Sequence, residues 1–292
     1  MFVSGFTIVR NAVKFDYPVK ESIESVLPLC DEVIVLIGNS EDETLALIES
    51  IGSEKIKIHH SVWDNSLREG GKVLAVETDK AFKLVNPKAD WCFYIQADEV
   101  LHEKFIPIVE HSMRKCLNQK DIDGLLFEYR HFFGNFNYLA SSRTYYRNEV
   151  RILRNNPEIH SYRDAQGFRK NGNKLSVKKS GGQIYHYGWV RHPEVMEEKI
   201  KSFHQLWHND EWIREQESLN PDFDYNNLDD VVPFMDTHPK YMQQRILKKN
   251  WDFKPSFNRK GKSLIKLLLF WIEKQTGIRV GEYKNYTLIE SD

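Results

Sequence analysis

Short apolar segments alternate with amphipathic segments along the first hundred residues of the chain. Residues 6–9 and 32–37 are runs of β-branched and other apolar side chains, residues 55–59 alternate between polar and apolar positions, and residues 91–95 form a further apolar run. A nearly continuous apolar run is typical of a strand that is covered on both faces. These four segments therefore predict strands.

Helical periodicity fills the intervals between these strands. Apolar residues recur at helical spacing from residue 19 to 27, from 44 to 51 and from 72 to 85. Regular alternation of strands and helices predicts an α/β fold with a mostly parallel, Rossmann-like sheet flanked by helices. Ligands of such sheets bind beside the carboxyl ends of the strands.

The pattern becomes less regular in the rest of the chain. A helix is predicted at 102–117, and strands are predicted at 124–129 and 183–187. The chain then becomes charged and mostly helical. We therefore predict one domain over residues 1–192 and a mostly helical C-terminal extension over residues 193–292, packed on or beside it.

The composition is that of a folded globular protein. The 292 residues include 41 Lys and Arg and 42 Asp and Glu, which gives a net charge of −1. Such a chain has no overall positive field, and this argues against a nucleic-acid partner. Three widely spaced cysteines without a CxxC pair argue against a disulfide scaffold or a cysteine zinc site, and they favour a reducing, cytoplasmic compartment.

One apolar segment near the C-terminus has two interpretations. No stretch reaches the roughly 18 uninterrupted apolar residues that a membrane span needs, and the segment at 263–272 carries a lysine. It either lies on the inner face of a membrane as an amphipathic helix or packs its apolar stripe on the domain. The second interpretation is favoured, and residues 262–273 remain a candidate for peripheral membrane contact.

Polar residues follow the predicted strands at the edge where ligands of such a sheet bind. Because the carboxyl ends of parallel strands meet at one edge, we expect these side chains to converge. They are Arg10 and Asn11 after the first strand, Ser40 and Asp42 after the second, and Gln96, Asp98 and Glu99 after the fourth.

Asp98 and Glu99 form the strongest local signal for chemistry. Two adjacent carboxylates at the end of a buried apolar strand are costly to place there unless something uses them. Mg²⁺ and Mn²⁺ bind carboxylate oxygens together with substrate phosphates, so Asp98 is a candidate metal ligand. The alternative is that Glu99 caps the following helix and Asp98 closes a turn.

Three further residues have both a functional and a structural interpretation. His186 lies in an aromatic segment and either binds a metal or packs as a core residue. The guanidinium of Arg191 matches a phosphate in geometry, or it lies on the surface. Asp164 lies between predicted strands and is either a general base or an ordinary turn residue.

Two helix starts are candidates for nucleotide contact. Ser40 or Asp42 can cap the helix that follows them, and the side chains of this loop could also hold a base or a ribose. Gly70 and Gly71 precede a predicted helix that begins at Lys72. A glycine pair at this place lets backbone amides approach a phosphate.

Together these motifs resemble the family 2 glycosyltransferases of the GT-A fold, particularly the bacterial members. Residues 6–11, 22–27 and 31–35 resemble the first strand, the first helix and the second strand of that family. The motifs of the following segments also resemble those of the family, and the resemblance covers residues 5–192. Residues 40–44 resemble its S-x-D-x-T nucleotide loop, residues 71–78 approximate its G-x-x-x-A-x-N helix, and residues 96–99 fall at its metal-binding DxD position.

The resemblance implies a hexosyltransferase of cell-envelope polysaccharide biosynthesis that uses a nucleotide-diphospho-sugar donor and Mn²⁺ or Mg²⁺. It implies transfer to a hydroxyl of a saccharide or lipid-linked acceptor, usually with inversion. It also implies roles for particular residues. Asp98 and His186 would bind the metal, Asp164 would be the catalytic base, and Arg10, Asn11, Ser40, Asp42, Lys72, Gln96 and Arg191 would contact the donor nucleotide.

Two departures from the family pattern keep other functions open. Gln96 replaces the first aspartate of the DxD motif, and Ile37 and Gly38 replace the aspartates that often end the second strand. The first change is consistent with a catalytically inactive protein that still binds a nucleotide or sugar. A sugar nucleotidyltransferase is a weaker alternative, because the chain lacks the basic glycine-rich N-terminal loop of those enzymes.

Overall fold

The structure is a computed structural model that describes residues 1–67, 69–219, 223–225, 231–255 and 264–289. Its strands are β1 (Val3–Val9), β2 (Glu32–Ile37), β3 (Ile56–His60), β4 (Trp91–Tyr94), β5 (Glu99–Leu101), β6 (Gly124–Phe133), β7 (Asn135–Ala140), β8 (Asn148–Arg154), β9 (Ile159–Tyr162), β10 (Gly167–Lys170), β11 (Asn173–Trp189), β12 (Val231–Pro233) and β13 (Tyr286–Leu288). Its α-helices are α1 (Val19–Val26), α2 (Thr44–Glu49), α3 (Lys72–Lys83), α4 (Ile106–Cys116), α5 (Pro193–Trp207), α6 (Asp210–Leu219), α7 (Gln243–Leu247) and α8 (Leu264–Thr276), and short 3₁₀ turns are η1 (Glu69–Gly71), η2 (Glu103–Phe105) and η4 (Lys240–Met242).

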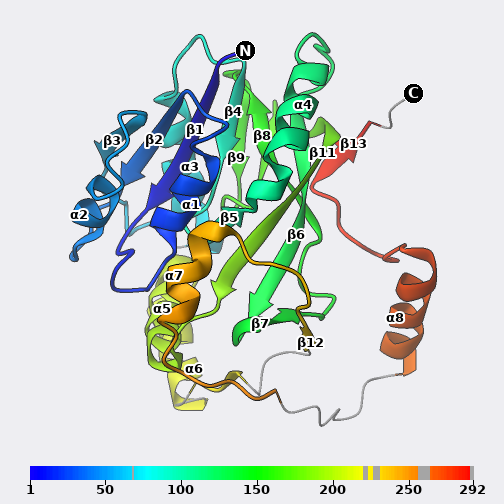
Figure 1. The fold of residues 1–292 in the computed structure, drawn as a ribbon. Coiled ribbons are helices and arrows are strands. Elements are labelled where there is room, and N and C mark those ends of the chain that lie inside the picture. Colours follow the sequence, from blue (N-terminus) through cyan, green and yellow to red (C-terminus); the bar gives the residue numbers. More distant parts are fainter. Residues whose placement is uncertain (68, 220–222, 226–230, 256–263, 290–292) are drawn as a thin grey trace.

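One mixed sheet runs through the molecule in the order β3-β2-β1-β4-β8-β6-β11-β10-β9 (Figure 1). Strands β3, β2, β1 and β4 pair in parallel. Strand β8 is antiparallel to both β4 and β6, and β6 is parallel to β11. The predicted α/β fold with a mostly parallel sheet flanked by helices is therefore confirmed.

Both faces of the sheet are covered, as the apolar runs predict. Val33 and Val35 of β2 belong to the core that includes apolar residues of α1 and α4, while Ile34 and Leu36 belong to the core that includes residues of α3. Successive residues of a strand point to opposite faces. A strand between two helical layers therefore has to be apolar at every position, and burial of each such side chain contributes about 1.5–3 kcal/mol.

The polar residues of β1 explain why its start is hard to predict. The apolar pattern predicts a strand from residue 6, but β1 begins at Val3. Ser4 is buried there and its hydroxyl donates to Glu32 Oε1 at 2.7 Å. Asp31 also accepts a hydrogen bond from the backbone N–H of Val3 at 2.8 Å. These polar contacts extend the strand where hydrophobicity gives no signal.

The C-terminal part of the chain contributes to the same sheet. Strand β13 pairs with β11 through Tyr286 and Leu175, and β12 pairs with β7. The long strand β11 also carries an irregularity of register between His186 and Trp189. The division of the chain at residue 192 remains a prediction, but residues on both sides of it share one sheet.

Helix α8 carries an exposed apolar surface. Leu268 and Trp271 are 57% and 59% exposed. Glu273 of the same helix forms ion pairs with Arg143 and Arg279. Within the described residues, no helix combines the length and the hydrophobicity that crossing a membrane requires. Of the candidate segment 262–273, residues 262 and 263 lie outside the described residues.

Candidate active site at the carboxyl edge of the sheet

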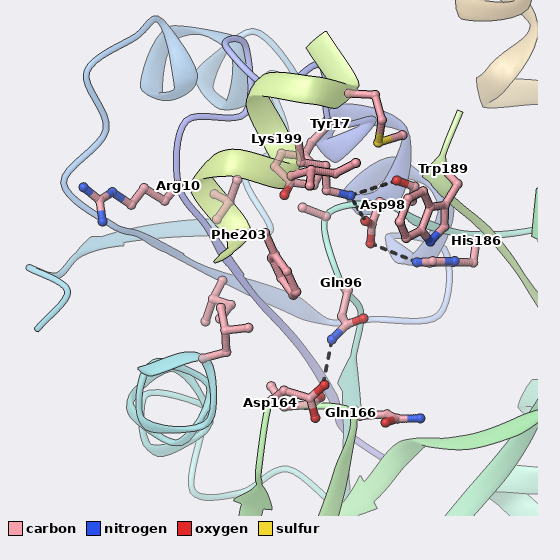
Figure 2. A pocket seen from close by; sticks show the side chains of 18 of the residues that line it. Arg10, Tyr17, Gln96, Asp98, Asp164, Gln166, His186, Trp189, Lys199 and Phe203 are labelled. Carbon is pink, nitrogen blue, oxygen red and sulfur yellow. Dashed lines mark hydrogen bonds and ion pairs between the residues drawn. The ribbon is translucent and has the colours of Figure 1, made fainter. Parts of the chain in front are cut away.

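A cavity of about 430 Å³ opens at the carboxyl ends of β1 and β4 (Figure 2). Its walls come from β11, from the turn between β9 and β10, and from α5. Aromatic side chains form much of the lining, and the polar groups gather at two places. The aromatic residues are Tyr17, Trp63, Tyr94, Tyr146, Trp189 and Phe203, and the polar residues include Arg10, Gln96, Asp98, Asp164, Gln166, His186 and Lys199.

Asp98 and His186 meet in this cavity from different elements. Asp98 ends the turn between β4 and β5, and its backbone oxygen accepts the N–H of Tyr187 in β11 at 2.8 Å. This bond ties the turn to β11 and brings Oδ1 of Asp98 to 3.6 Å from Nε2 of His186. Oδ2 of Asp98 lies 3.4 Å from the ammonium of Lys199. Figure 2 shows this group on one side of the cavity.

Glu99 points away from the cavity and has a structural role. It is fully buried, and its two oxygens accept hydrogen bonds from Nε and Nη2 of Arg151 at 2.9 and 2.7 Å. The hydroxyl of Tyr129 donates to the same carboxylate at 2.8 Å. A buried bidentate ion pair of this kind is costly to break. Glu99 lies in β5 and not at a helix start, so the helix-cap interpretation of this residue is wrong.

A chain of hydrogen bonds fixes which nitrogen of His186 carries its proton. Nε2 of His131 lies 2.7 Å from the backbone oxygen of Tyr146, which can only accept, so this nitrogen is protonated. Nδ1 of a neutral His131 is then an acceptor, and it lies 3.0 Å from Nδ1 of His186. His186 must donate from Nδ1, and this leaves the lone pair of its Nε2 facing the carboxylate of Asp98.

Burial and charge set the protonation states of this group. Burial would raise the pKa of Asp98, but the positive charges of His186 (when it is protonated at low pH), Lys199 and Arg191 outweigh this effect and lower the pKa to about 2. Burial lowers the pKa of His186, and Asp98 only partly opposes this effect. Burial, together with Arg191, lowers the pKa of Lys199 to about 7. At neutral pH the site therefore contains a carboxylate and a neutral imidazole.

Gly188 leaves the space in front of these two acceptors open. A Cβ atom at this position would lie 2.6 Å from Nε2 of His186 and 3.1 Å from Oδ2 of Asp98. Gly188 lies within the register irregularity of β11, and its backbone oxygen accepts the ammonium of Lys199 at 2.8 Å. Bulges of this kind often re-aim side chains beside active sites.

The donor set fits a divalent cation whose remaining ligands come from a substrate. The carboxylate of Asp98 and the lone pair of His186 Nε2 are two acceptors that face each other with no proton between them, and a cation relieves this contact. Mg²⁺ and related ions commonly bind one or two protein groups together with substrate phosphates. Among the described residues, no cluster of three or more His, Cys, Asp or Glu side chains could hold a metal without such a substrate.

Asp164 lies on the other side of the cavity, with Gln96 between it and Asp98 in the view of Figure 2. Its neighbours Arg163 and Ala165 both adopt left-handed backbone conformations, with φ of 58° and 62°. Such strain costs about 1–3 kcal/mol per residue and is common at functional sites. Burial raises the pKa of Asp164, and this makes its carboxylate a better proton acceptor.

The residues predicted to contact the nucleotide are mostly used to hold loops together. Ser40 accepts the backbone N–H of Asn11 at 3.0 Å, and the side chain of Asn11 accepts the N–H of Glu41 at 2.8 Å. Asp42 accepts from the backbone N–H groups of Thr44 and Lys14. Ser40 and Asp42 therefore shape this loop.

Arg10 and Asn11 border a second cavity of about 730 Å³ next to the first. The two cavities share Arg10, Tyr17, Trp63 and Lys199 in their linings. The guanidinium of Arg10 lies 5.7 Å from the ring centroid of Trp63, a distance at which a cation and an indole attract each other. A ligand that extends from Asp98 past Arg10 would occupy both cavities.

Gln96, Arg191 and Lys72 occupy three different settings. The amide of Gln96 donates to the hydroxyl of Tyr94 and to the backbone oxygen of Ala165, at 3.3 and 3.4 Å. Arg191 is fully buried, donates to the backbone oxygen of Gly188 at 2.6 Å and is not among the lining residues of the cavity. Lys72 lines a different cavity.

Lys199 is a site residue that the sequence reasoning missed. It lies on α5, on the same helical stripe as Met196, Ile200 and Phe203, and all four line the cavity. A lysine at a position of the buried stripe of an amphipathic helix is a signal that could have been used. The predicted domain ends at residue 192, and this helix begins directly after it.

No protein-family model matches the chain, and no curated protein sequence matches it. Among solved structures, it is similar to the glucosyl-3-phosphoglycerate synthase from Mycobacterium tuberculosis in complex with Mn²⁺, UDP and phosphoglyceric acid, with 18% identity over 44% of this chain and 43% of that chain and a TM-score of 0.31. It is also similar to S. aureus TarS, with 14% identity over 70% of this chain and 64% of TarS 1–349 and a TM-score of 0.37. Another structure of S. aureus TarS is similar with 15% identity over 70% of this chain and 39% of that chain, and with a TM-score of 0.38. The chain thus spans less than two thirds of each of these structures, and the similarities are too distant to assign a function.

Proposed function

We propose that this protein is a glycosyltransferase that moves a sugar from a nucleotide-diphospho-sugar to an acceptor hydroxyl, with a divalent metal ion at Asp98 and His186. The observation that carries the proposal is the pairing of these two acceptors, 3.6 Å apart, at the carboxyl edge of a parallel sheet. Their positions in the chain match the motifs that resemble family 2 glycosyltransferases. Membership of that family, Mn²⁺ or Mg²⁺ as the ion and inversion at the sugar carbon are parts of this proposal.

The lining of the cavity supports a sugar nucleotide as the ligand. Tyr17, Trp63 and Phe203 present aromatic surface, which packs on the apolar faces of sugars and bases. The adjacent cavity extends the space past Arg10. Together the two cavities offer room for a sugar near Asp98 and for a nucleoside beyond it.

The chemistry needs charge stabilisation at one side of the cavity and proton removal at the other. A divalent ion at Asp98 and His186 would stabilise the negative charge that grows on the departing diphosphate. Lys199 lies 3.4 Å from Asp98, and in its protonated form it would add a positive charge at the same place. Asp164 takes the proton of the acceptor hydroxyl as the new bond to the sugar carbon forms.

A second candidate function is a GT-A-fold protein that binds a nucleotide or sugar without turnover. Gln96 favours it, because an uncharged amide stands where the family has its first motif aspartate and both of its hydrogen bonds hold Tyr94 and Ala165. Hydrolysis of the donor without an acceptor separates the two functions. An enzyme releases sugar slowly under these conditions, whereas a binding protein leaves the donor intact.

The substitution Asp98→Asn tests the proposed metal site. We expect nucleoside diphosphates to raise the melting temperature of the wild-type protein more with Mn²⁺ than without it. Asp98→Asn should remove at least nine tenths of the Mn²⁺-dependent gain in affinity, because the amide is a poor ligand for a hard cation. Asp121→Asn, an exposed carboxylate outside the three cavities, is the matched control.

Two results would contradict the proposed function. In one, Asp98→Asn retains the full Mn²⁺-dependent binding of nucleoside diphosphates, and the metal assignment fails. In the other, the wild-type protein binds no nucleoside diphosphate with or without the ion, and the donor assignment fails as well.

A further inference from the structure

Another cavity of about 690 Å³ lies on the far side of Asp164 from the metal-site candidate. It lies between the start of α3, the turn between β9 and β10, and the end of α5. Asp164 and Gln166 line both this cavity and the cavity that holds Asp98. The proposed catalytic base therefore stands in the wall between two spaces. The lining residues of the second space include Gly70, Lys72, Asp79, Arg163 and Trp207.

We propose that this second space, named here the Lys72 cavity, binds the phosphate group of a phosphorylated acceptor. Lys72 and Arg163 supply two exposed cationic side chains to it, and no ion pair with either is found among the described residues. The carboxylate of Asp79 is already engaged, since it accepts the backbone N–H of Ser161 at 2.6 Å and lies 3.4 Å from His160. Asp164 is the other carboxylate of the described lining, and burial raises its pKa, which reduces its negative charge. Two cations without an ion pair in the described part of the chain therefore favour an anion.

The backbone at the start of α3 adds donors in the same place. Gly70 and Gly71 both have positive φ, at 59° and 71°, and they precede the 12-residue helix α3. The first N–H groups of an α-helix have no partner within the helix, and they favour a negative ligand. The glycine pair thus leads the chain into an anion-attracting helix start beside Lys72.

Trp207 supplies an independent sign of a missing ligand. Its indole Nε1 is a buried N–H donor, and no acceptor for it is found among the described residues. A Cβ atom at Gly71 would lie 3.1 Å from Cε2 of Trp207, the ring atom bonded to Nε1. The indole ring of Trp207 therefore lies against the start of α3, and its ring also lines the cavity. Buried donors normally have partners, and a phosphate oxygen would supply one.

In this arrangement the donor and the acceptor reach Asp164 from different cavities. The inference rests on the proposed function: the donor occupies the cavity with Asp98, and the acceptor approaches through the Lys72 cavity. Its phosphate is held by Lys72, Arg163 and the indole of Trp207, and its hydroxyl reaches Asp164. This places Lys72 on the acceptor and not on the donor nucleotide.

Inorganic phosphate is the probe that tests this cavity in the full-length protein. It is titrated by calorimetry after the donor site has been saturated with a nucleoside diphosphate and Mn²⁺, and again without them. We expect one phosphate to bind in both cases. Lys72→Gln or Arg163→Gln should weaken its binding at least tenfold. Trp207→Phe should weaken it several-fold, because it keeps an aromatic ring but removes the N–H.

Lys83→Gln is the matched control, because Lys83 is an exposed lysine at the other end of α3. It should bind phosphate as the wild-type protein does, and all four variants should keep the affinity for nucleoside diphosphate with Mn²⁺. Absence of phosphate binding, or binding that Lys72→Gln and Arg163→Gln leave unchanged, overturns the inference. Loss of nucleotide binding in the wild-type protein instead contradicts the proposed donor site, so the two failures are distinguishable.

Discussion

Asp98 and Glu99 are adjacent carboxylates with opposite environments. Asp98 faces the cavity, while Glu99 is held in the core by Arg151 and Tyr129. Neighbouring residues at a strand point to opposite sides, so one carboxylate reaches the ligand side and the other the interior. The ion pair of Glu99 and Arg151 also holds the turn between β9 and β10, because Arg151 donates to the backbone oxygen of Gln166 at 3.0 Å.

Asp164→Asn separates binding from catalysis. The amide keeps the shape of the side chain but cannot take a proton. We expect the affinity for nucleoside diphosphate with Mn²⁺ to stay within about twofold of the wild-type value, and the rate of sugar transfer to fall by about 10²–10⁴-fold. Calorimetry and a transfer assay check the two parts. Transfer at the wild-type rate would show that another group is the base.

Glu149 makes stability depend on pH. It is buried in β8 next to Gln166, and burial raises its pKa to about 7. Below pH 4.5 both the folded and the unfolded protein hold this proton, so the carboxyl does not lower the free energy of unfolding. As the pH rises toward 7, the unfolded state loses the proton first and becomes favoured. The free energy of unfolding thereby falls by up to about 3 kcal/mol.

Glu149→Gln should remove this pH dependence, because its amide resembles the protonated carboxyl. We expect the variant to unfold at a higher denaturant concentration than the wild-type protein at pH 8, and at a similar concentration at pH 4.5. Denaturant titrations at the two pH values measure the difference. Equal stabilities at pH 8 would mean that Glu149 is charged in the folded protein at little cost.

Residue types predicted the polar edge of the sheet better than they predicted individual partners. Asp98 lies at the strand-end edge that the pattern predicts, and it meets His186 in one cavity, as the family resemblance implies. The sequence did not predict His131 as a site residue. It orients His186 through contacts with the backbone oxygen of Tyr146 and with the imidazole of His186, and these groups come together only in the fold. Arg191 has the chemistry of a phosphate ligand but is buried, and burial of one side chain is not encoded locally.

At the scale of elements, strand β11 shapes the site through its irregular end. The register irregularity places Gly188 against the imidazole of His186 and directs its backbone oxygen to Lys199. The backbone at Gly188 requires no left-handed conformation. The lack of a side chain there therefore serves space and not flexibility.

Gly188→Ala should fill the space in front of the metal ligands. The new methyl group would lie 2.5 Å from Cε1 of His186, so the ring must turn away. We expect the affinity for Mn²⁺, titrated by calorimetry in the presence of a nucleoside diphosphate, to fall at least tenfold. Wild-type affinity in this variant would show that the ion binds elsewhere.

Gly182→Ala is the matched comparison on the same strand. Its methyl group would lie 2.6 Å from Val109 and 2.8 Å from Phe127, both in the core. This variant should lower the melting temperature and leave the affinity for Mn²⁺ unchanged below it, since overpacking a core costs about 1–3 kcal/mol.

Elements with strong periodicity were predicted well, and elements made by pairing across the fold were not. Strand β2 has the predicted bounds because all of its residues are buried. The helix predicted from residue 102 starts instead at Ile106, after η2, where the side chain of His102 accepts the backbone N–H of Lys104. Strands β12 and β13 are short and form only because β7 and β11 offer free edges.

The whole molecule joins its two predicted parts at the active site. Helix α5 follows residue 192 and contributes Lys199 and Phe203 to a cavity whose other walls come from the first part. Sequence patterns describe each segment separately, so they give no signal that a later helix completes an earlier site. We therefore expect that residues 1–192 alone would lack one wall of the donor cavity.

Peripheral membrane contact through α8 is tested by substitution and not by deletion. Removing the chain from residue 262 would also remove Glu282, which pairs with Arg147, and Tyr286 of β13. If α8 lies on a membrane surface, the wild-type protein should sediment in part with anionic vesicles. Leu268→Glu with Trp271→Glu should abolish this, because both side chains are exposed apolar groups.

Leu247→Glu on α7 is the control for this experiment, since Leu247 is 78% exposed on a different helix. It should sediment as the wild-type protein does. If the wild-type protein does not sediment with vesicles, or if the double variant sediments equally, α8 has no role at a membrane.

The most direct test of the proposed metal site is to locate Mn²⁺ by its anomalous scattering in crystals grown with Mn²⁺ and a nucleoside diphosphate. We expect a peak bonded to the carboxylate of Asp98 and to Nε2 of His186, with the diphosphate completing the coordination. A diphosphate bound in this cavity without a peak between these two residues, or a Mn²⁺ peak elsewhere, would contradict it.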